Sequence, residues 1–114
     1  MTDPIHQLKA KVTDQVKVAE ESFLLSLEAP PIAGLIRPGQ FIQIGCSEKY
    51  DPLLPRPFSI YRVRQKRYLD ILYEVVGQGT EEMAKAKKGN RLNIFGPLGN
   101  TFSYPKGRVL SFLV

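Results

Sequence analysis

The sequence predicts an all-β fold, a six-stranded antiparallel barrel with one short helix. Nine glycines and nine prolines among 114 residues indicate frequent turns. Several short segments alternate apolar and polar residues, as strands with one buried face do. A single segment, at about residues 80–87, instead places glutamates before lysines, which is the charge order that a helix dipole favours. Short strands separated by turn residues are typical of a closed or nearly closed barrel.

Six segments carry the strand pattern, and we expect the first of them to break near Thr13. In the fifth segment, four alternate positions are predicted to face the core: Leu69, Ile71, Tyr73 and Val75. The six predicted strands are residues 7–18, 22–28, 41–46, 58–63, 68–76 and 90–95, with loops at 29–39 and 47–55 and a bend at 96–100. In the predicted helix, Thr80 is the cap and Gly89 the stop signal.

The charge and composition restrict the class of function. A net charge of +5 favours an anionic ligand or partner, and 43% hydrophobic residues indicate a globular chain. The basic residues cluster only at 62–67 and 85–88, and such charge runs are most often solvated faces. With one cysteine (Cys46) and one histidine (His6), the chain has no internal disulfide framework and no four-ligand zinc site of the usual kind.

The same inventory favours a cytoplasmic location. Cys46 is expected to pack as a small apolar residue, because a free cysteine in a reducing compartment is usually buried and inert. The first residues lack the apolar run of a signal peptide, and no apolar segment approaches membrane-spanning length. We therefore expect no membrane partner.

The first candidate binding stretch runs from Pro55 to Ser59. Two prolines bracket Arg56 and hold it in an extended conformation. In the strand that follows, Phe58 and Ser59 point to opposite faces. The stretch therefore presents a cation, a flat ring and a hydroxyl within a few residues, although such a segment is often only a strand entry with a solvated arginine.

The second stretch is the glycine-rich turn of Gly77, Gln78, Gly79 and Thr80, which runs into the predicted helix. Free amides at a helix start favour anions, whereas the simpler interpretation is a capped turn. A cation and a helix start together suit a pyrophosphate, and a ring with a hydroxyl suits a flat heteroaromatic group. Taken together, the two stretches predict a dinucleotide across a strand edge. Glu81 and Glu82 would repel a phosphate, so we expect their side chains to face solvent.

These motifs resemble the FAD-binding barrel of the ferredoxin reductase superfamily, and in particular the electron-transfer subunits of dihydroorotate dehydrogenase. The resemblance rests on residues 56–59, 79–80 and the Phe-Gly-Pro-Leu-Gly-Asn-Thr-Phe run at 95–102, with residues 37–41 fitting the same pattern. It extends from about Val12 to the end of the chain. It implies a Greek-key barrel that binds FAD non-covalently.

The resemblance also implies roles for individual residues. Arg56 is expected to bind the pyrophosphate, Pro57 and Phe58 to form a ledge under the isoalloxazine, and Ser59 to hydrogen-bond near its reactive edge. Phe58 stands where many family members have tyrosine, so it keeps the ring but lacks the hydroxyl. The remaining cofactor-binding positions are a strand segment (Leu72, Tyr73 and Glu74) and the turn (Gly79 and Thr80). Glu74 replaces a residue that is often basic, so we expect its backbone to make the contact. Tyr73 is either a stacking ring or a core residue.

The domain organisation follows from the same resemblance. Residues 1–107 are expected to form the FAD-binding barrel, and residues 108–114 resemble the first strand of a nucleotide-binding domain. The family's iron–sulfur and NAD sites have no counterpart in this sequence, so we expect either a fragment or a stand-alone barrel. As such, it is not expected to reduce its flavin with NADH at catalytic rates. The apolar tail is expected to be disordered, folded back on the barrel, or buried in self-association.

The expected role is the FAD-binding domain of an electron-transfer subunit of NAD-linked dihydroorotate dehydrogenase, an oxidoreductase of pyrimidine biosynthesis. Its partner would be an FMN-containing catalytic subunit, with electrons passing between FAD, an iron–sulfur centre and NAD. One alternative is the flavin domain of a ferredoxin–NADP or sulfide-linked reductase subunit. An alternative of another class is a small basic barrel that binds oligonucleotides. Three aromatic residues that look like core positions, Phe23, Phe41 and Tyr73, argue against nucleic acid.

Overall fold

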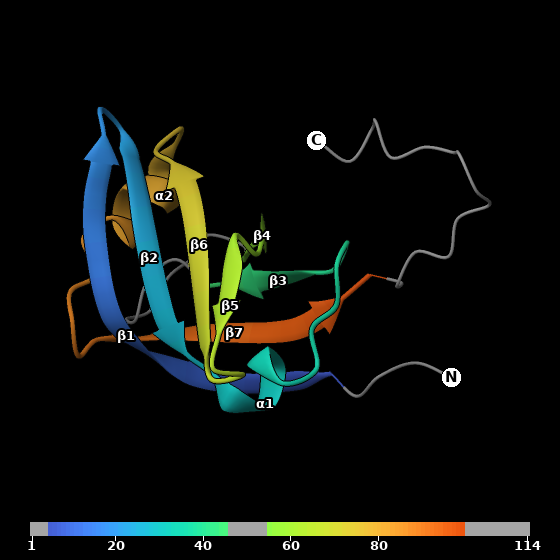
Figure 1. Ribbon diagram of the computed structural model, residues 1–114. Helices are drawn as coiled ribbons and strands as arrows, with labels where there is room; N and C mark the ends of the chain where they lie inside the picture. Colours follow the sequence, from blue (N-terminus) through green and yellow to red (C-terminus); the bar gives the residue numbers. More distant parts are fainter. Residues whose placement is uncertain (1–4, 46–54, 100–114) are drawn as a thin grey trace.

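The computed structural model describes residues 5–45 and 55–99, which form one antiparallel sheet of seven strands with two short helices (Figure 1). The strands are β1 (His6–Ala19), β2 (Ser22–Glu28), β3 (Phe41–Ile44), β4 (Arg56–Ser59), β5 (Arg62–Arg64), β6 (Tyr68–Glu74) and β7 (Arg91–Leu98), and the helices are α1 (Pro30–Ala33) and α2 (Gln78–Met83).

The order of the strands forces the sheet to curl. The order is β4-β3-β7-β1-β2-β6-β5, so β4 and β5 lie at opposite ends of the sheet. Only Ile60 and Tyr61 separate these two strands in the sequence. An extended chain rises at most about 3.6 Å per residue, so the Cα atoms of Ser59 and Arg62 lie within about 11 Å of each other. The two ends of the sheet are therefore neighbours, and the sheet forms a half-barrel (Figure 1).

The long strand β1 serves both halves of this half-barrel. Its first part pairs with β7 (His6 to Lys11) and its second part with β2 (Lys11 to Ala19). The register with β2 shifts between Val12 and Asp14. Such a bulge bends a strand and increases its twist. The predicted break near Thr13 thus corresponds to this bulge: the alternation is interrupted there, but the chain stays in the sheet and β1 continues to Ala19.

The core lies on the concave side of the sheet. Residues predicted to share the core face of the fifth segment do so: Leu69 and Ile71 are fully buried, and Tyr73 is 6% exposed. Leu25 and Leu27 from β2 are also fully buried, and Phe23 packs at the margin of the core. The remaining buried apolar residues come from β1, β3, β7 and the helices: Ala10, Val12, Ala29, Ile32, Ala33, Ile42, Ile44, Met83, Leu92 and Ile94.

Several predicted boundaries are corrected by the structure. The number of strands is seven in the described residues, because the predicted strand 58–63 is divided at Ile60 and Tyr61 into β4 and β5. The predicted loop 29–39 contains α1, which begins with two prolines, and proline is well suited to a first helical turn. The last predicted strand continues through the expected bend to Leu98. The Greek-key connection stays a prediction.

Helix α2 is shorter than the sequence indicates and begins earlier. It runs from Gln78 to Met83, so Lys85, Lys87 and Lys88 lie beyond its end. Only Glu81 of the predicted charge pattern occupies the first turn of the helix. The favourable charge order therefore describes the whole segment rather than the helix itself.

Some predictions concern residues outside the described ranges. These are the packing of Cys46, the loose end at residues 1–4, most of the loop at 47–55 and the apolar tail at 108–114. Within the described ranges, neither helix is long and apolar enough to cross a membrane.

The outer face of the sheet carries a buried carboxylate. The side chain of Asp70 on β6 is only 1% exposed, and it accepts hydrogen bonds from Arg62 Nε (2.8 Å), Arg64 Nε (2.8 Å) and Ser26 Oγ (2.8 Å). Burial raises the pKa of Asp70, but the bonds from Arg64, Arg62 and Ser26 outweigh burial and hold this pKa below its ordinary value. Two arginines of the basic cluster at 62–67, which was expected to be a solvated face, thus stabilise the sheet.

This arrangement predicts a pH-dependent contribution of Asp70 to stability. Because the pKa of Asp70 is lower in the folded state, its contribution is present above the unfolded-state pKa of about 3.9 and is lost as the pH falls through the folded-state value. Asp70→Asn should lower the free energy of unfolding at pH 7 by about 1–3 kcal/mol. The difference from wild type should shrink at about pH 3.

Urea titrations at both pH values measure this difference. Glu28→Gln is the matched control, since Glu28 is a half-buried carboxylate whose described ion-pair partner is the exposed Arg67. An Asp70→Asn effect of equal size at the two pH values would show that the charge of Asp70 is not what stabilises the sheet.

Candidate functional site

The two candidate stretches, which are more than twenty residues apart in the sequence, meet in space. The side chain of Arg56, at the start of β4, lies directly over Gly79 in α2. A Cβ atom added at Gly79 would lie 2.7 Å from Arg56 Nε and 3.4 Å from its Cζ and Nη2 atoms. Gly79 is therefore a position where the absence of a side chain lets a guanidinium group approach the helix backbone.

The start of α2 is held by the hydroxyl group of Thr80. Thr80 Oγ1 accepts hydrogen bonds from the backbone N–H groups of Val76 (2.9 Å) and Gly77 (3.1 Å), and it donates to the Gly77 carbonyl (3.0 Å). The hydroxyl is thus fully engaged within the turn. Any bond from Thr80 to a ligand would therefore come from its backbone amide and not from its side chain.

The electrostatics at this point favour an anion. The first intrahelical amide bond of α2 joins Glu81 N–H to the Gly77 carbonyl (2.9 Å), which leaves the preceding amides at the helix start without an intrahelical acceptor. The Arg56 guanidinium adds a full positive charge, and the structure gives it no ion pair with a described acidic residue. Glu82 is turned toward Lys85 (Oε2–Nζ 2.9 Å).

The rest of β4 forms an open ledge at one end of the sheet. Its partner on the inner side is β3, with Phe41 opposite Ser59 and Ile42 opposite Phe58. Pro57 and Ser59 are exposed, while Phe58 is half-buried. The Phe58 ring meets the ring of Tyr73 edge-on, at a centroid distance of 6.0 Å and an interplanar angle of 75°. The ring of Phe58 on the ledge therefore packs against β6.

The end of β6 offers an unpaired strand edge beside this ledge. The pairing of β5 with β6 stops at Asp70, whose carbonyl accepts a bond from Tyr61 N–H (2.8 Å). Backbone groups alternate in direction along a strand, so the peptide groups of Leu72 and Glu74 point the same way as those of Asp70, away from β2. No described strand pairs with them there. The side chains of Leu72 and Glu74 are exposed.

Tyr73 occupies a core position between two other aromatic rings. It stacks on Phe23 at a centroid distance of 5.8 Å and contacts Phe58, and its hydroxyl donates to Gln15 Oε1 (2.6 Å). Of the two predicted roles for Tyr73, the packing supports the core one. Gln15 was not identified from the sequence, because the bulge in β1 shifts the alternation and places this polar residue on the inner face.

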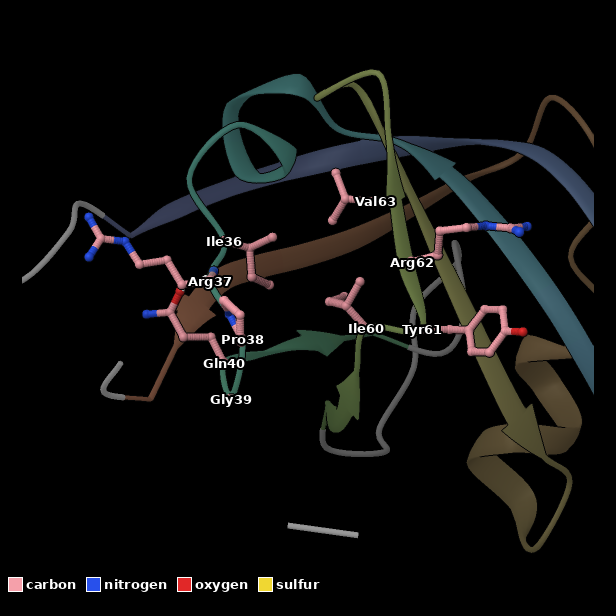
Figure 2. A pocket seen from close by; sticks show the side chains of 9 residues that line it. All are labelled: Ile36, Arg37, Pro38, Gly39, Gln40, Ile60, Tyr61, Arg62 and Val63. Atoms are coloured by element: carbon pink, nitrogen blue, oxygen red, sulfur yellow. Dashed lines mark hydrogen bonds between the residues drawn. The ribbon is translucent and has the colours of Figure 1, made fainter. Parts of the chain in front are cut away.

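Two hollows lie elsewhere on the described surface. One, of about 240 Å³, is lined by residues 36–40 and 60–63, with Ile36 and Val63 on opposite sides of it (Figure 2). It contains part of the upstream Arg37–Phe41 motif. The other is lined by Asp14, Gln15, Phe23 and residues 84–88. Neither of these two hollows is lined by Arg56 or Gly79.

In the described ranges, no group of three or more histidine, cysteine, aspartate or glutamate residues is placed to hold a metal ion.

The nine predicted positions fall into three sets. Two pairs are in direct contact, Arg56 with Gly79 and Phe58 with Tyr73. Thr80 is engaged within its own turn, and four positions are exposed: Pro57, Ser59, Leu72 and Glu74.

Comparison with known proteins gives relatives for most of the chain. No family model matches the sequence. The chain is 46% identical over 97 residues to the electron transfer subunit of dihydroorotate dehydrogenase B (NAD(+)) from Desulforamulus reducens, which covers 84% of this chain and 37% of the relative. It is 39% identical over 92 residues to the subunit of the same name from Bacillus mycoides, which covers 80% of this chain and 36% of that relative.

Solved structures share the same fold. A chain of an NADH-dependent reduced ferredoxin-NADP oxidoreductase matches with a TM-score of 0.74 and 26% identity, over 82% of this chain and 34% of its own length. The ferredoxin reductase of carbazole 1,9a-dioxygenase matches with a TM-score of 0.76 and 22% identity, over 94% of this chain and 32% of its own length. The chain is therefore a ferredoxin reductase-like β domain that is similar in sequence to dihydroorotate dehydrogenase B electron transfer subunits, and it spans a little over a third of the length of these relatives.

Proposed function

We propose that this domain binds FAD non-covalently and acts as the flavin-holding part of an electron transfer subunit. The observation that carries the proposal is the contact of Arg56 with Gly79 at the start of α2. This contact brings a guanidinium group and free helix amides to one point, and both recognise phosphate oxygens. A pyrophosphate carries enough charge and enough acceptors to engage both groups at once.

The shape of the site also fits a dinucleotide. Arg56 packs so closely on Gly79 that a Cβ atom there would displace it, and this paired arrangement of guanidinium and helix start is here called the cradle. From this cradle, β4 leads along an exposed ledge to Ser59, whose hydroxyl makes no hydrogen bond to another described residue. A pyrophosphate bound at Arg56 thus places the rest of a flavin nucleotide along Pro57, Phe58 and Ser59.

The open edge of β6 supplies further polar groups for the ring system. The peptide groups of Leu72 and Glu74 face this edge, so their N–H and C=O groups suit the polar edge of an isoalloxazine. Glu74 contributes through its backbone, and Thr80 through its amide. When bound, FAD supplies the electron-transfer chemistry, and these residues hold and orient it.

The names of the relatives suggest the larger assembly. We infer that the whole protein is the electron transfer subunit of an NAD-linked dihydroorotate dehydrogenase of pyrimidine biosynthesis, located in the cytoplasm, with an FMN-containing catalytic subunit as its partner. In that assembly, electrons would pass between FAD, an iron–sulfur centre and NAD. The identity of 46% to such a subunit favours this reading over a ferredoxin–NADP reductase, for which the matched structure has 26% identity.

The first test compares two flavins. The domain should bind FAD more tightly than FMN, because only FAD has the pyrophosphate that Arg56 and the α2 amides address together. Titration of the flavin-free protein, followed by flavin fluorescence, measures both dissociation constants. Equal affinities would remove the pyrophosphate assignment.

The second test replaces Arg56 and the glycine beneath it, with a nearby glycine as the control. Arg56→Ala should weaken FAD binding by about 1.5–3 kcal/mol, the range for a hydrogen bond to a charged group. Gly79→Ala should also weaken it, because the new methyl group displaces the guanidinium. Gly77→Ala is the matched control, since a Cβ atom there meets nothing within 4 Å and the extended φ of −178° suits any residue.

The glycine variants separate the cradle from the ordinary strand-entry interpretation of Arg56. FAD binding that survives both Arg56→Ala and Gly79→Ala at wild-type strength would contradict the cradle. If Gly77→Ala lowered FAD affinity as much as Gly79→Ala, the conformation of the turn, and not the contact of Arg56 with Gly79, would determine FAD binding.

A further inference from the structure

Gln15 connects three parts of the molecule through one side chain. Its Nε2 group donates to the carbonyl of Met83 (3.0 Å) and to the carbonyl of Ala86 (2.8 Å), at the end of α2 and just beyond it. Its Oε1 atom accepts from the Tyr73 hydroxyl (2.6 Å). The two carbonyls can only accept, so they fix the orientation of the amide. All the hydrogen-bonding atoms of this side chain are therefore engaged.

These bonds complete a ring of contacts around the seam of the half-barrel, which is the place where β4 approaches β6 without pairing with it. From α2 the ring passes through Gln15 to Tyr73, and from Tyr73 through an edge-on aromatic contact to Phe58 on β4. Two residues earlier on β4, Arg56 returns to α2 by lying over Gly79. The ring therefore includes both the anion-favouring point and the ledge.

Helix α2 depends on such anchors for its position. It has six residues, and an isolated helix of this length is not stable in water. Its start is tied by the Thr80 hydroxyl, and its underside by the fully buried Met83. The carbonyl of Met83 at its far end, and that of Ala86 just beyond, accept hydrogen bonds from Gln15, so Gln15 is the third anchor of the helix.

We propose that Gln15 is a positioning residue that sets the distance and angle between the pyrophosphate-binding start of α2 and the ring-binding ledge of β4. The inference rests on the proposed flavin function. Gln15 acts through other groups: its amide holds α2 by the far end, and through Tyr73 it supports Phe58. FAD would span both the start of α2 and the ledge of β4, whereas FMN, which lacks the pyrophosphate, would occupy mainly the ledge. The binding of FAD therefore requires this alignment more than the binding of FMN does.

The ratio of FMN to FAD dissociation constants tests this alignment. Gln15→Glu keeps an acceptor for Tyr73 but loses both donors to α2, and it should reduce the wild-type preference for FAD by about tenfold while changing FMN affinity little. Gln15→Leu loses all three bonds and should reduce the preference at least as much. Tyr73→Phe removes the ring-side bond and keeps both donors to α2, so it should reduce the preference less than Gln15→Glu.

The matched control is Thr13→Val, which removes another side-chain bond of β1, from Thr13 Oγ1 to the Ser26 carbonyl (3.3 Å), away from α2. Thermal melting of each flavin-free variant identifies general destabilisation, which Thr13→Val should reproduce without altering the preference for FAD. If wild type prefers FAD and both Gln15 variants keep that preference, Gln15 is only a structural residue and the inference is wrong. If wild type itself binds FAD and FMN equally, the pyrophosphate assignment is wrong, and the inference about Gln15, which rests on it, is wrong with it.

Discussion

The fold depends on the short crossing from β4 to β5. Because only Ile60 and Tyr61 join strands at opposite ends of the sheet, the seven strands cannot lie flat, and the two ends are drawn together. The bulge in β1 is the complementary feature, since it lets one long strand follow the curvature and pair with β7 in one half and β2 in the other. The concave core results from this curvature.

The candidate site lies where the sheet has nearly closed but has no hydrogen-bonded ladder. There β4 contacts β6 through Phe58 and Tyr73, and it contacts α2 through Arg56 and Gly79. The seam therefore has backbone groups on an unpaired edge, an arginine over a helix start and an open ledge. A continuous ladder between β4 and β6 would have consumed the edge that a ligand can use.

The sequence was sufficient for the features that depend on local chemistry. Alternation identified the core face of Leu69 and Ile71, and the prolines around Arg56 identified an extended segment. Three features depended on tertiary context and could not be predicted: the division at Ile60, the inward position of Gln15 after the bulge, and the burial of Asp70. Asp70 has the residue type of a surface position, and only the pairing of β5 with β6 brings arginines to it.

Both ends of the sheet also carry features that discourage other chains from adding a strand. Pro57, within β4, has no amide hydrogen to offer a neighbour, and proline in sheets is confined to such outer strands. At the opposite end, β5 has only three residues, two of them arginines, and short charged outer strands resist edge-to-edge aggregation. The outer strands β4 and β5 thus resist β-pairing with other polypeptides, while the site between the two ends of the sheet stays open to a small ligand.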